Sequence, residues 1–323
     1  MIMSDAASPT PPIAHGPRST DDCPVPTDRR SGDTGADPAA LADPAALADL
    51  VAAGGVVALT GAGISTESGI PDYRGPNGAY SRGHKPMTLQ DFTRDPEARR
   101  RYWARSFVGW RRFAAAQPND GHRALAELEQ RGLLEGVITQ NVDGLHQRAG
   151  SRRVIDLHGR LEQIRCLACE SRFPRDAVHA QLREANPGWQ PSAGHANPDG
   201  DVELRDSDLV GFEGVDCARC SGPLKPDVVY FGESVPPERV AEATAMVLAA
   251  SALLVLGTSL SVYSGRRFTR AAASAGIPVA VVNQGPTRAD EEATIKLDAP
   301  LGPVLSALLA TVDTSRSRHR SPA

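Results

Sequence analysis

Lysine is scarce in this sequence, and a surplus of positive charge is missing. Only three of the 323 residues are lysine (Lys85, Lys225 and Lys296), so arginine carries nearly all the positive charge. The formal net charge is −4 at pH 7. Because nucleic-acid-binding proteins usually carry a basic surplus, this charge argues against a nucleic-acid partner. Small molecules and proteins are therefore the expected partners.

Long apolar segments are also missing. No window approaches the roughly 18 apolar residues that a membrane span needs, so we expect no membrane partner. The first twelve residues lack a basic stretch followed by an apolar run, which argues against a secretory signal. Acidic residues occur where mitochondrial presequences avoid them, at Asp5, Asp21, Asp22 and Asp28. The sequence therefore predicts a cytoplasmic protein.

Cysteine is infrequent as well, but four of the five cysteines form two close pairs. In a reducing compartment such clusters are more often metal ligands than disulfides. Cys166-x-x-Cys169 and Cys217-x-x-Cys220 match the two knuckles of a four-thiolate zinc site, so we predict one structural zinc ion per chain. The 47 residues between the pairs (170–216) are more than usual, but closing a longer loop costs only slightly more free energy.

Other uses of these cysteines stay open. Either pair could be a redox-active dithiol. A nucleic-acid-binding zinc ribbon is disfavoured because acidic residues surround the second pair, at Asp206, Asp208, Glu213 and Asp216. The fifth cysteine, Cys23, belongs to neither pair.

The two ends of the sequence lack apolar periodicity. Residues 1–36 are rich in Pro, Ser, Thr, Asp and Gly, which predicts a disordered tail, and residues 314–323 predict a disordered basic tail. After the first tail, the hexapeptide Asp-Pro-Ala-Ala-Leu-Ala occurs twice, at 37–42 and 43–48. Asp followed by Pro can cap and begin a helix, and we expect the second copy to do so.

Between the tails, apolar runs alternate with helical patterns. Buried-strand patterns occur at 56–60, 136–139, 252–256 and 278–282. Helical stretches such as 121–130 and 237–250 lie between them. Strands that alternate with helices imply an α/β fold with a Rossmann-like, doubly wound parallel sheet.

Two segments interrupt this alternation and predict a smaller lobe over the sheet. Residues 73–118 are arginine-rich and partly helical, and residues 160–232 contain the zinc module. We therefore expect one catalytic domain over residues 37–313, with a zinc-ribbon and helical lobe formed by these two segments. The larger, Rossmann-like lobe takes the remaining segments, at about 37–72, 119–159 and 233–313.

All four predicted strands run into loops that contain Gly, Asn or Ser, and ligands of doubly wound sheets bind beyond the carboxyl ends of the strands. The first loop contains Gly61-x-Gly63, which suits a tight turn whose amides face a phosphate. The strict dinucleotide fingerprint fails, because Thr66 stands where a third glycine is expected. Taken alone, the loop is equally compatible with a turn that binds nothing.

Six blocks, in their order along the chain, resemble the signature of the sirtuin family. They are Gly61–Ser65, Gly69–Arg74, Thr139–Asp143, Leu157–Gly159, Lys225–Glu233 and Gly257–Leu260. The resemblance covers residues from about 40 to about 310, nearly the whole predicted domain. Arg101–Arg105 and Val262–Gly265 further resemble the class II branch, typified by the mitochondrial sirtuin 4 of animals.

The resemblance implies an NAD-dependent protein-lysine deacylase. Such an enzyme cleaves NAD to nicotinamide and transfers the acyl group from a lysine side chain of a target protein to ADP-ribose. The reaction needs a base for a ribose hydroxyl, and histidine has a suitable ordinary pKa at neutral pH. The resemblance places this base at His158, which follows the apparent strand 154–157, and gives Asn141 a catalytic role as well.

The resemblance also implies where NAD binds. Gln140, Asn141 and Asp143 would form the nicotinamide and ribose pocket, although Asp143 could instead simply cap a helix. Asp72 and Arg74 would belong to a segment that covers the cofactor. The full set of predicted cofactor contacts is Gly61, Ala62, Gly63, Ile64, Ser65, Asp72, Tyr73, Arg74, Gln140, Asn141, Val142, Asp143, Gly257, Thr258, Ser259, Asn283, Gln284, Gly285 and Leu301.

The segment around Val229, Tyr230, Phe231 and Gly232, with the loop 260–263, would flank the substrate peptide. Family members bind that peptide as an extra strand between the lobes, through main-chain hydrogen bonds. Such recognition depends little on the side chains of the peptide.

Tyr102 and Arg105 lie three apart on a predicted helix, and hence on one face. A phenol beside a guanidinium could bind an acidic acyl group, such as succinyl or glutaryl, by charge-assisted hydrogen bonds. Because other arginines surround them, a solvated basic face explains the pair equally well.

Two rival functions stay open from the sequence. A mono-ADP-ribosyltransferase would share the NAD site and differ in the acceptor. A non-catalytic NAD-sensing protein would bind NAD without releasing nicotinamide, although the intact His158 does not favour it. A zinc-ribbon DNA-binding protein is the weakest alternative on grounds of charge.

Overall fold

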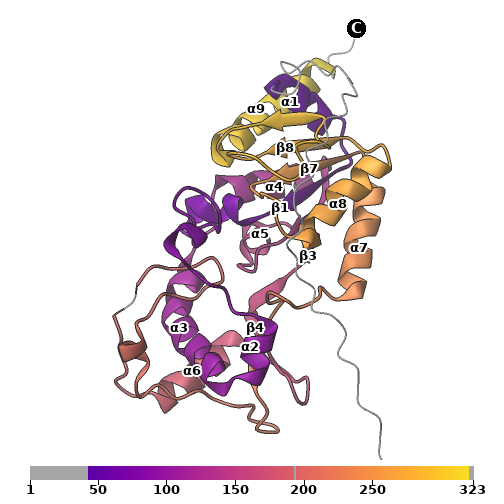
Figure 1. The fold of residues 1–323 in the computed structure, drawn as a ribbon. Coiled ribbons are helices and arrows are strands. Elements are labelled where there is room, and N and C mark those ends of the chain that lie inside the picture. The colour runs from indigo at the N-terminus through magenta and orange to yellow at the C-terminus, as the bar shows by residue number, and fades with distance from the viewer. Residues whose placement is uncertain (1–42, 193, 320–323) are drawn as a thin grey trace, which may run out of the picture. The chain divides into compact units, whose positions relative to one another are not determined.

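The computed structural model describes residues 43–192 and 194–319, so the predicted tail at 1–36 and Cys23 lie outside the described residues. A six-stranded sheet with the order β3-β2-β1-β7-β8-β9 forms the centre of the larger lobe (Figure 1). Its strands are Val154–Asp156 (β3), Leu134–Thr139 (β2), Val56–Thr60 (β1), Ala252–Leu256 (β7), Val279–Val282 (β8) and Ile295–Leu297 (β9). All neighbouring strands pair in parallel, which confirms the predicted doubly wound sheet.

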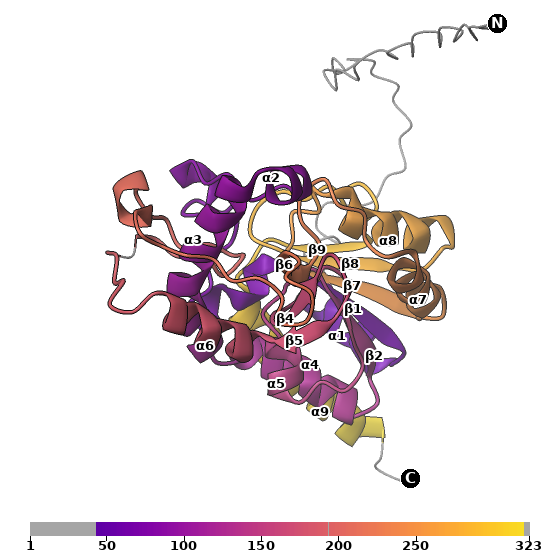
Figure 2. The same cartoon turned by 90° about the horizontal axis from the view of Figure 1, so that it is seen from below.

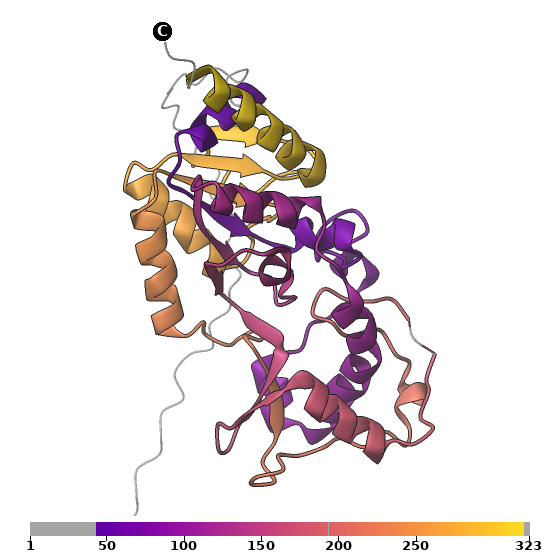
Figure 3. The ribbon, with the colours of Figure 1, turned by 180° about the vertical axis from the view of Figure 1, so that it is seen from behind.

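Consecutive residues of β1 point to opposite faces of the sheet. Val56 and Ala58 belong to an apolar cluster with α1 (Pro44–Ala52), α4 (Asp120–Gln130) and α9 (Leu301–His319). Val57 and Leu59 belong to a second cluster with α7 (Pro237–Leu248) and α8 (Tyr263–Ser274). Figures 1 and 3 show these two helix layers on either side of the sheet. Because both faces are covered, β1 and β7 are buried at every residue, and their sequences are nearly continuous apolar runs.

The ends of the described chain bear on two predictions. The second copy of the repeated hexapeptide begins α1 as predicted, with the carboxylate of Asp43 accepting a 2.8 Å hydrogen bond from the amide of Ala45. The prediction of a disordered tail from residue 314 is wrong as far as His319, because α9 continues to that residue. No glycine or proline occurs between residues 304 and 319 to end the helix. None of the described helices is both long and apolar enough to cross a membrane.

The smaller lobe combines a three-stranded antiparallel sheet with helices. The sheet has the order β5-β4-β6, and its strands are Arg172–Pro174 (β5), Gly159–Cys166 (β4) and Leu224–Val228 (β6). Its helices are α2 (Leu89–Arg94), α3 (Pro96–Ala115) and α6 (Arg175–Ala185). Aromatic residues of α3 and apolar residues of β4 and β6 share a separate core. Figure 2 shows this group of elements beside the large sheet and its helices α7 and α8.

The strand order of the large sheet determines where a ligand can bind. Strand β1 lies between β2 and β7, and the three strands are parallel. The loops that follow them therefore begin at the same edge of the sheet. A short helix, α5 (Leu145–Ala149), and three 3-10 turns, η2 (Ala62–Ser68), η3 (Tyr80–Arg82) and η4 (Asp206–Leu209), complete the described elements. After β1 the chain adds β2 and β3 on one side of it and then β7, β8 and β9 on the other, so the strand order reverses at β1. Open parallel sheets bind ligands at such a reversal, beyond the carboxyl ends of the strands.

Candidate active site

A cleft of about 1760 Å³ opens at this edge of the sheet. Its lining comes from the loops after β1, β2, β7 and β8 and from segments of the smaller lobe. All predicted cofactor and substrate residues lie on its wall, except Ile64 and Arg105, and so does His158. Ile64 is instead 2% exposed and packs under the loop in the core of the large lobe. The structure therefore brings together residues that are up to 240 positions apart in the sequence (from Gly61 to Leu301).

The glycines of the first loop allow the backbones of two loops to touch. A Cβ atom at Gly63 would lie 2.8 Å from the Cα atom of Gly257, and one at Gly61 would lie 2.6 Å from the Cβ atom of Thr258. The amide of Gly63 also donates a 2.9 Å hydrogen bond to the carbonyl of Gly257. The glycines therefore let the loops after β1 and β7 pack backbone against backbone at the cleft wall, where a side chain on either glycine would clash.

His158 lies in the short turn between β3 and β4 and has a fixed orientation. Its Nδ1 lies 2.9 Å from the carbonyl oxygen of Gln140, and its Nε2 lies 2.9 Å from Oγ of Ser264. Burial lowers the pKa of His158 to about 4, and the charge of Arg239 acts in the same direction. Because a carbonyl only accepts hydrogen bonds, the neutral ring carries its proton on Nδ1 and presents the lone pair of Nε2. His158 is therefore an unprotonated base at neutral pH.

Asn141 and Asp143 follow β2 and connect its loop to the loop after β1. The side-chain amide of Asn141 donates 3.0 Å hydrogen bonds to the carbonyl of Gly61 and to Oγ of Ser65. Ser65 in turn donates a 2.7 Å hydrogen bond to Asp143, whose other oxygen accepts from the amide of Leu145. Burial raises the pKa of Asp143, and these hydrogen bonds oppose that rise. Asp143 therefore supports the start of α5 and also lines the cleft, while its contact with the cofactor stays a prediction.

Two buried histidines behind this network were not predicted from the sequence. His146 Nε2 lies 2.9 Å from Oγ1 of Thr60, and His122 Nε2 lies 3.5 Å from Oγ of Ser65. Burial lowers the pKa of His122 to about 4 and that of His146 well below its ordinary value. Both rings are therefore neutral supports beneath the cleft.

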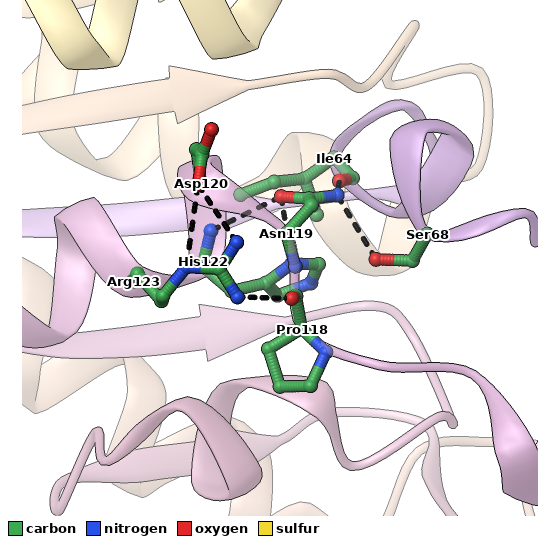
Figure 4. Close-up of polar contacts among 7 residues, drawn as sticks. All are labelled: Ile64, Ser68, Pro118, Asn119, Asp120, His122 and Arg123. Carbon is green, nitrogen blue, oxygen red and sulfur yellow. Dashed lines mark hydrogen bonds and ion pairs between the residues drawn. The ribbon is translucent and has the colours of Figure 1, made fainter.

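Asn119 positions His122 and the first loop together. Its side chain caps α4, accepting a hydrogen bond from the amide of His122, and donates to the carbonyl of Ile64 (2.7 Å) and to Ser68 (3.0 Å). Figure 4 shows Asn119 between the first turn of α4 and the turn that carries Ile64 and Ser68. An Asn before a helical pattern is a sequence signal for the cap, but not for the contacts across the sheet edge.

The four paired cysteines converge in the smaller lobe. Their sulfur atoms all lie within 4.8 Å of one another, and all four cysteines are free thiols. Sγ of Cys166 is 3.5 Å from that of Cys220, and Sγ of Cys169 is 3.8 Å from that of Cys217. Zinc–sulfur bonds of about 2.3 Å in a tetrahedron require sulfur atoms about 3.8 Å apart. These cysteines therefore fit a structural zinc ion, as predicted.

Tyr102 and Arg105 do not form the predicted carboxylate clamp. Tyr102 is 2% exposed, and its ring packs against those of Phe92 and Tyr230 at the cleft wall. Arg105 is not among the lining residues of the cleft and forms an ion pair of 3.0 Å with Asp201. Its Nε donates to the carbonyl of Val202. The geometry therefore does not support the hypothesis that Arg105 binds an acidic acyl group.

The predicted peptide-binding segment lies on the cleft wall beyond β6. The amide of Val229 donates a 2.8 Å hydrogen bond to the carbonyl of His158, and the carbonyl of Phe231 accepts one from Leu89. Phe231 is 37% exposed, and its ring meets that of Tyr73 edge-on, with the ring centroids 6.4 Å apart. The segment is thus attached to both lobes and to the base.

Comparison with known proteins gives consistent results. A model of the Sir2 family matches residues 61–264. The NAD-dependent protein deacetylase 1 of Streptomyces coelicolor is 57% identical over 239 residues, which are 74% of this chain and 80% of that protein. The NAD-dependent protein deacetylase of Xanthomonas axonopodis pv. citri is 52% identical over 251 residues, 78% of this chain and 85% of that protein.

Solved structures agree with the sequence relatives. A structure on the mechanism and regulation of Sir2 enzymes has a TM-score of 0.68 at 33% identity, over 84% of this chain and 98% of that chain. A Sir2 complex with a p53 peptide and NAD+ has a TM-score of 0.67 at 33% identity, over 83% and 98%. The assignment to the class II branch stays a prediction. The family model, the relatives and the shared fold show that this chain belongs to the Sir2 family of sirtuins.

Proposed function

We propose that this protein is an NAD-dependent protein-lysine deacetylase, which cleaves NAD to nicotinamide and transfers the acyl group of a modified lysine to ADP-ribose. The observation that carries the proposal is the neutral His158 on the cleft wall, whose Nδ1–H donates to the carbonyl of Gln140 and whose basic Nε2 is hydrogen-bonded to Ser264. The names of relatives that are more than half identical to this chain support the same reaction.

NAD supplies an anomeric carbon from which nicotinamide can leave when the acyl oxygen attacks. The residues of the chain have separate tasks in that reaction. His158 accepts a proton from a ribose hydroxyl, and the carbonyl of Gln140 stabilises the resulting imidazolium. Asn141 faces the same cleft with its amide fixed by Gly61 and Ser65, and this geometry suits a group that orients substrate.

The remaining predicted cofactor residues surround this centre. Asp72, Tyr73 and Arg74 belong to the segment that we propose covers NAD, and the carboxylate of Asp72 accepts a 2.7 Å hydrogen bond from the amide of Gly75. Ser259 and Asn283, after β7 and β8, are proposed to contact the adenosine half. The free volume of about 1760 Å³ is large enough for a dinucleotide together with an acyl-lysine side chain.

We expect small apolar acyl groups to be the better substrates. The wall near Tyr102 is aromatic, because Tyr230 and Phe231 line the same cleft. Arg105 does not provide a cationic partner for a carboxylate, because its guanidinium is already bound to Asp201 and to the carbonyl of Val202. The peptide that carries the acyl-lysine is proposed to lie along residues 228–233 and the loop 260–263.

We also propose that the four cysteines bind one structural zinc ion, since four protein ligands leave no open position for substrate. The four cysteines form no disulfide, and this fits a reducing compartment and supports the expected cytoplasmic location.

The test is a reaction of the full-length protein with NAD and peptides that carry acetyl-, succinyl- or methylglutaryl-lysine. Nicotinamide and peptide mass are followed together, with His158→Tyr as the inactive control. Loss of the acetyl group coupled to nicotinamide release, absent from the variant, supports the deacetylase. ADP-ribose attached to protein would indicate the ADP-ribosyltransferase instead, and NAD binding without nicotinamide release would indicate the sensor.

A further inference from the structure

Both ring nitrogens of His158 have partners within the protein. The Nδ1–H group donates a 2.9 Å hydrogen bond to the carbonyl of Gln140, and this bond fixes the tautomer of the ring. Nε2 must then be the acceptor in its 2.9 Å contact with Ser264, so the hydroxyl of Ser264 donates to it. A hydroxyl oxygen that donates its proton still has two lone pairs with which it can accept a hydrogen bond.

The position of Ser264 is built into the fold rather than left to an exposed loop. Ser264 is the second residue of α8, and its neighbour Gly265 is buried against the side chain of Gln140. A Cβ atom at Gly265 would lie 2.6 Å from Oε1 of Gln140, and a 2.9 Å hydrogen bond to Thr258 holds that side chain in place. One residue, Gln140, therefore orients the base through its carbonyl and positions the start of α8 through its side chain.

Ser264 also lies where a substrate can reach it. It lines the cleft together with His158, and both residues are only partly buried. Nε2 of His158 has a single lone pair, and Ser264 occupies it. A substrate hydroxyl that gives its proton to His158 must therefore either displace Ser264 or pass the proton through it.

We propose that Ser264 is a further catalytic residue, which relays the proton of the substrate ribose hydroxyl to His158; this inference rests on the proposed function. The O–H bond of the substrate breaks as its proton binds Oγ of Ser264. At the same time the O–H bond of Ser264 breaks, and its proton moves to Nε2 of His158. The electron pair stays on the substrate oxygen, which becomes the nucleophile, while Ser264 ends neutral and His158 ends as an imidazolium.

The relay explains the arrangement better than displacement does. A hydroxyl can donate to the neutral ring and accept from the protonated ring, so Ser264 remains a partner of His158 in both states. Burial disfavours the imidazolium, and a partner that stays in contact while the charge forms offsets part of that cost. Displacement would remove this partner at the moment when the charge appears.

The test compares Ser264→Ala and Ser264→Thr with the full-length wild-type protein in single-turnover deacetylation, with enzyme in excess over acetylated peptide. We expect Ser264→Ala to lower the rate of acetyl transfer at least about tenfold, with the KM for NAD changed less than about threefold, because general acid–base groups contribute to the rate more than to binding. Ser264→Thr keeps the hydroxyl and should recover most of the rate. Ser274→Ala, an exposed serine at the far end of the same helix, is the matched control.

The number of protons transferred together in the rate-limiting step can be measured from the solvent isotope effect. A purely structural role of Ser264 would not change that number. A plot of the wild-type rate against the fraction of deuterium oxide should be curved, because two coupled proton transfers contribute. The same plot for Ser264→Ala should be linear, because a single proton transfer remains. A Ser264→Ala rate equal to or above that of the wild type would overturn the relay and show that Ser264 is displaced. Absence of deacetylation by the wild-type protein would instead overturn the proposed function, and the relay with it.

Discussion

Arg105 on α3 lies with its Nη2 3.0 Å from Oδ2 of Asp201, in a partly buried ion pair. The side chain of Asp201 is 4% exposed and that of Arg105 20%. Burial and the nearby carboxylate of Asp199 raise the pKa of Asp201 well above its ordinary value, and Arg105 opposes that rise. The arginine that the sequence suggested as a substrate ligand is therefore the counter-ion of a buried acid, and this difference has a measurable consequence.

Arg105→Met should destabilise the fold without changing acyl preference. The substitution leaves Asp199 and Asp201 close together without their guanidinium, and the loss of one partner of a buried pair lowers the unfolding free energy by about 3 kcal/mol. Urea denaturation measures this loss, and acetyl and succinyl peptides give the ratio of the two activities. Arg101→Met on the same helix removes only an exposed contact with Asp206 and should change stability by less than about 0.5 kcal/mol. Selective loss of desuccinylation in a stable Arg105→Met protein would restore the carboxylate-clamp hypothesis.

Stability should fall as the pH decreases from 7 to 5, and His122 should contribute to that fall. Burial places the folded-state pKa of His122 at about 4, below the ordinary value of 6.5, so the unfolded chain binds a proton that the folded chain does not. The stabilisation is present above pH 6.5 and is lost progressively toward pH 4. Between pH 7 and pH 5 the wild type should lose about 2 kcal/mol more than His122→Asn, as measured by urea denaturation at each pH. Parallel pH profiles for the two proteins would contradict this assignment.

Removal of one thiolate should release the metal and loosen the smaller lobe. Cys217 is buried among the four sulfur atoms, so Cys217→Ser should reduce the zinc content from one ion per chain to nearly none. Loss of a structural zinc site lowers stability by several kcal/mol, so the melting temperature should fall by roughly 10 °C or more. Elemental analysis and thermal denaturation measure the two effects. A zinc content that stays at one ion per chain in the variant would place the metal elsewhere.

The parts of the structure that could be predicted are those with a local signal. The apolar runs of β1 and β7, the spacing of the cysteine pairs and the Asp-Pro start of α1 each depend on residues close together in the sequence. The strand β9 was not predicted, because its three residues are too few to show a pattern.

The contacts that were missed join residues that are distant in the sequence. Asp201 lies 96 positions after Arg105, and Ser264 lies 106 positions after His158, so no periodicity or spacing indicates either pair. The helical spacing of Tyr102 and Arg105 was correct, but spacing cannot show which acid a long arginine side chain will meet. The motif that contains His158 identified the residue, whereas its tautomer and its second partner come only from the fold.

The most direct test of the proposed function is the stoichiometry of nicotinamide release and acetyl loss in one reaction. The full-length protein is incubated with NAD and an acetyl-lysine peptide, and both products are quantified by mass spectrometry over the first turnovers. We expect one nicotinamide for each acetyl group removed, with one O-acetyl-ADP-ribose formed, and none of the three with His158→Tyr. Nicotinamide release without loss of the acetyl group would contradict the assignment of this cleft as the site of lysine deacetylation.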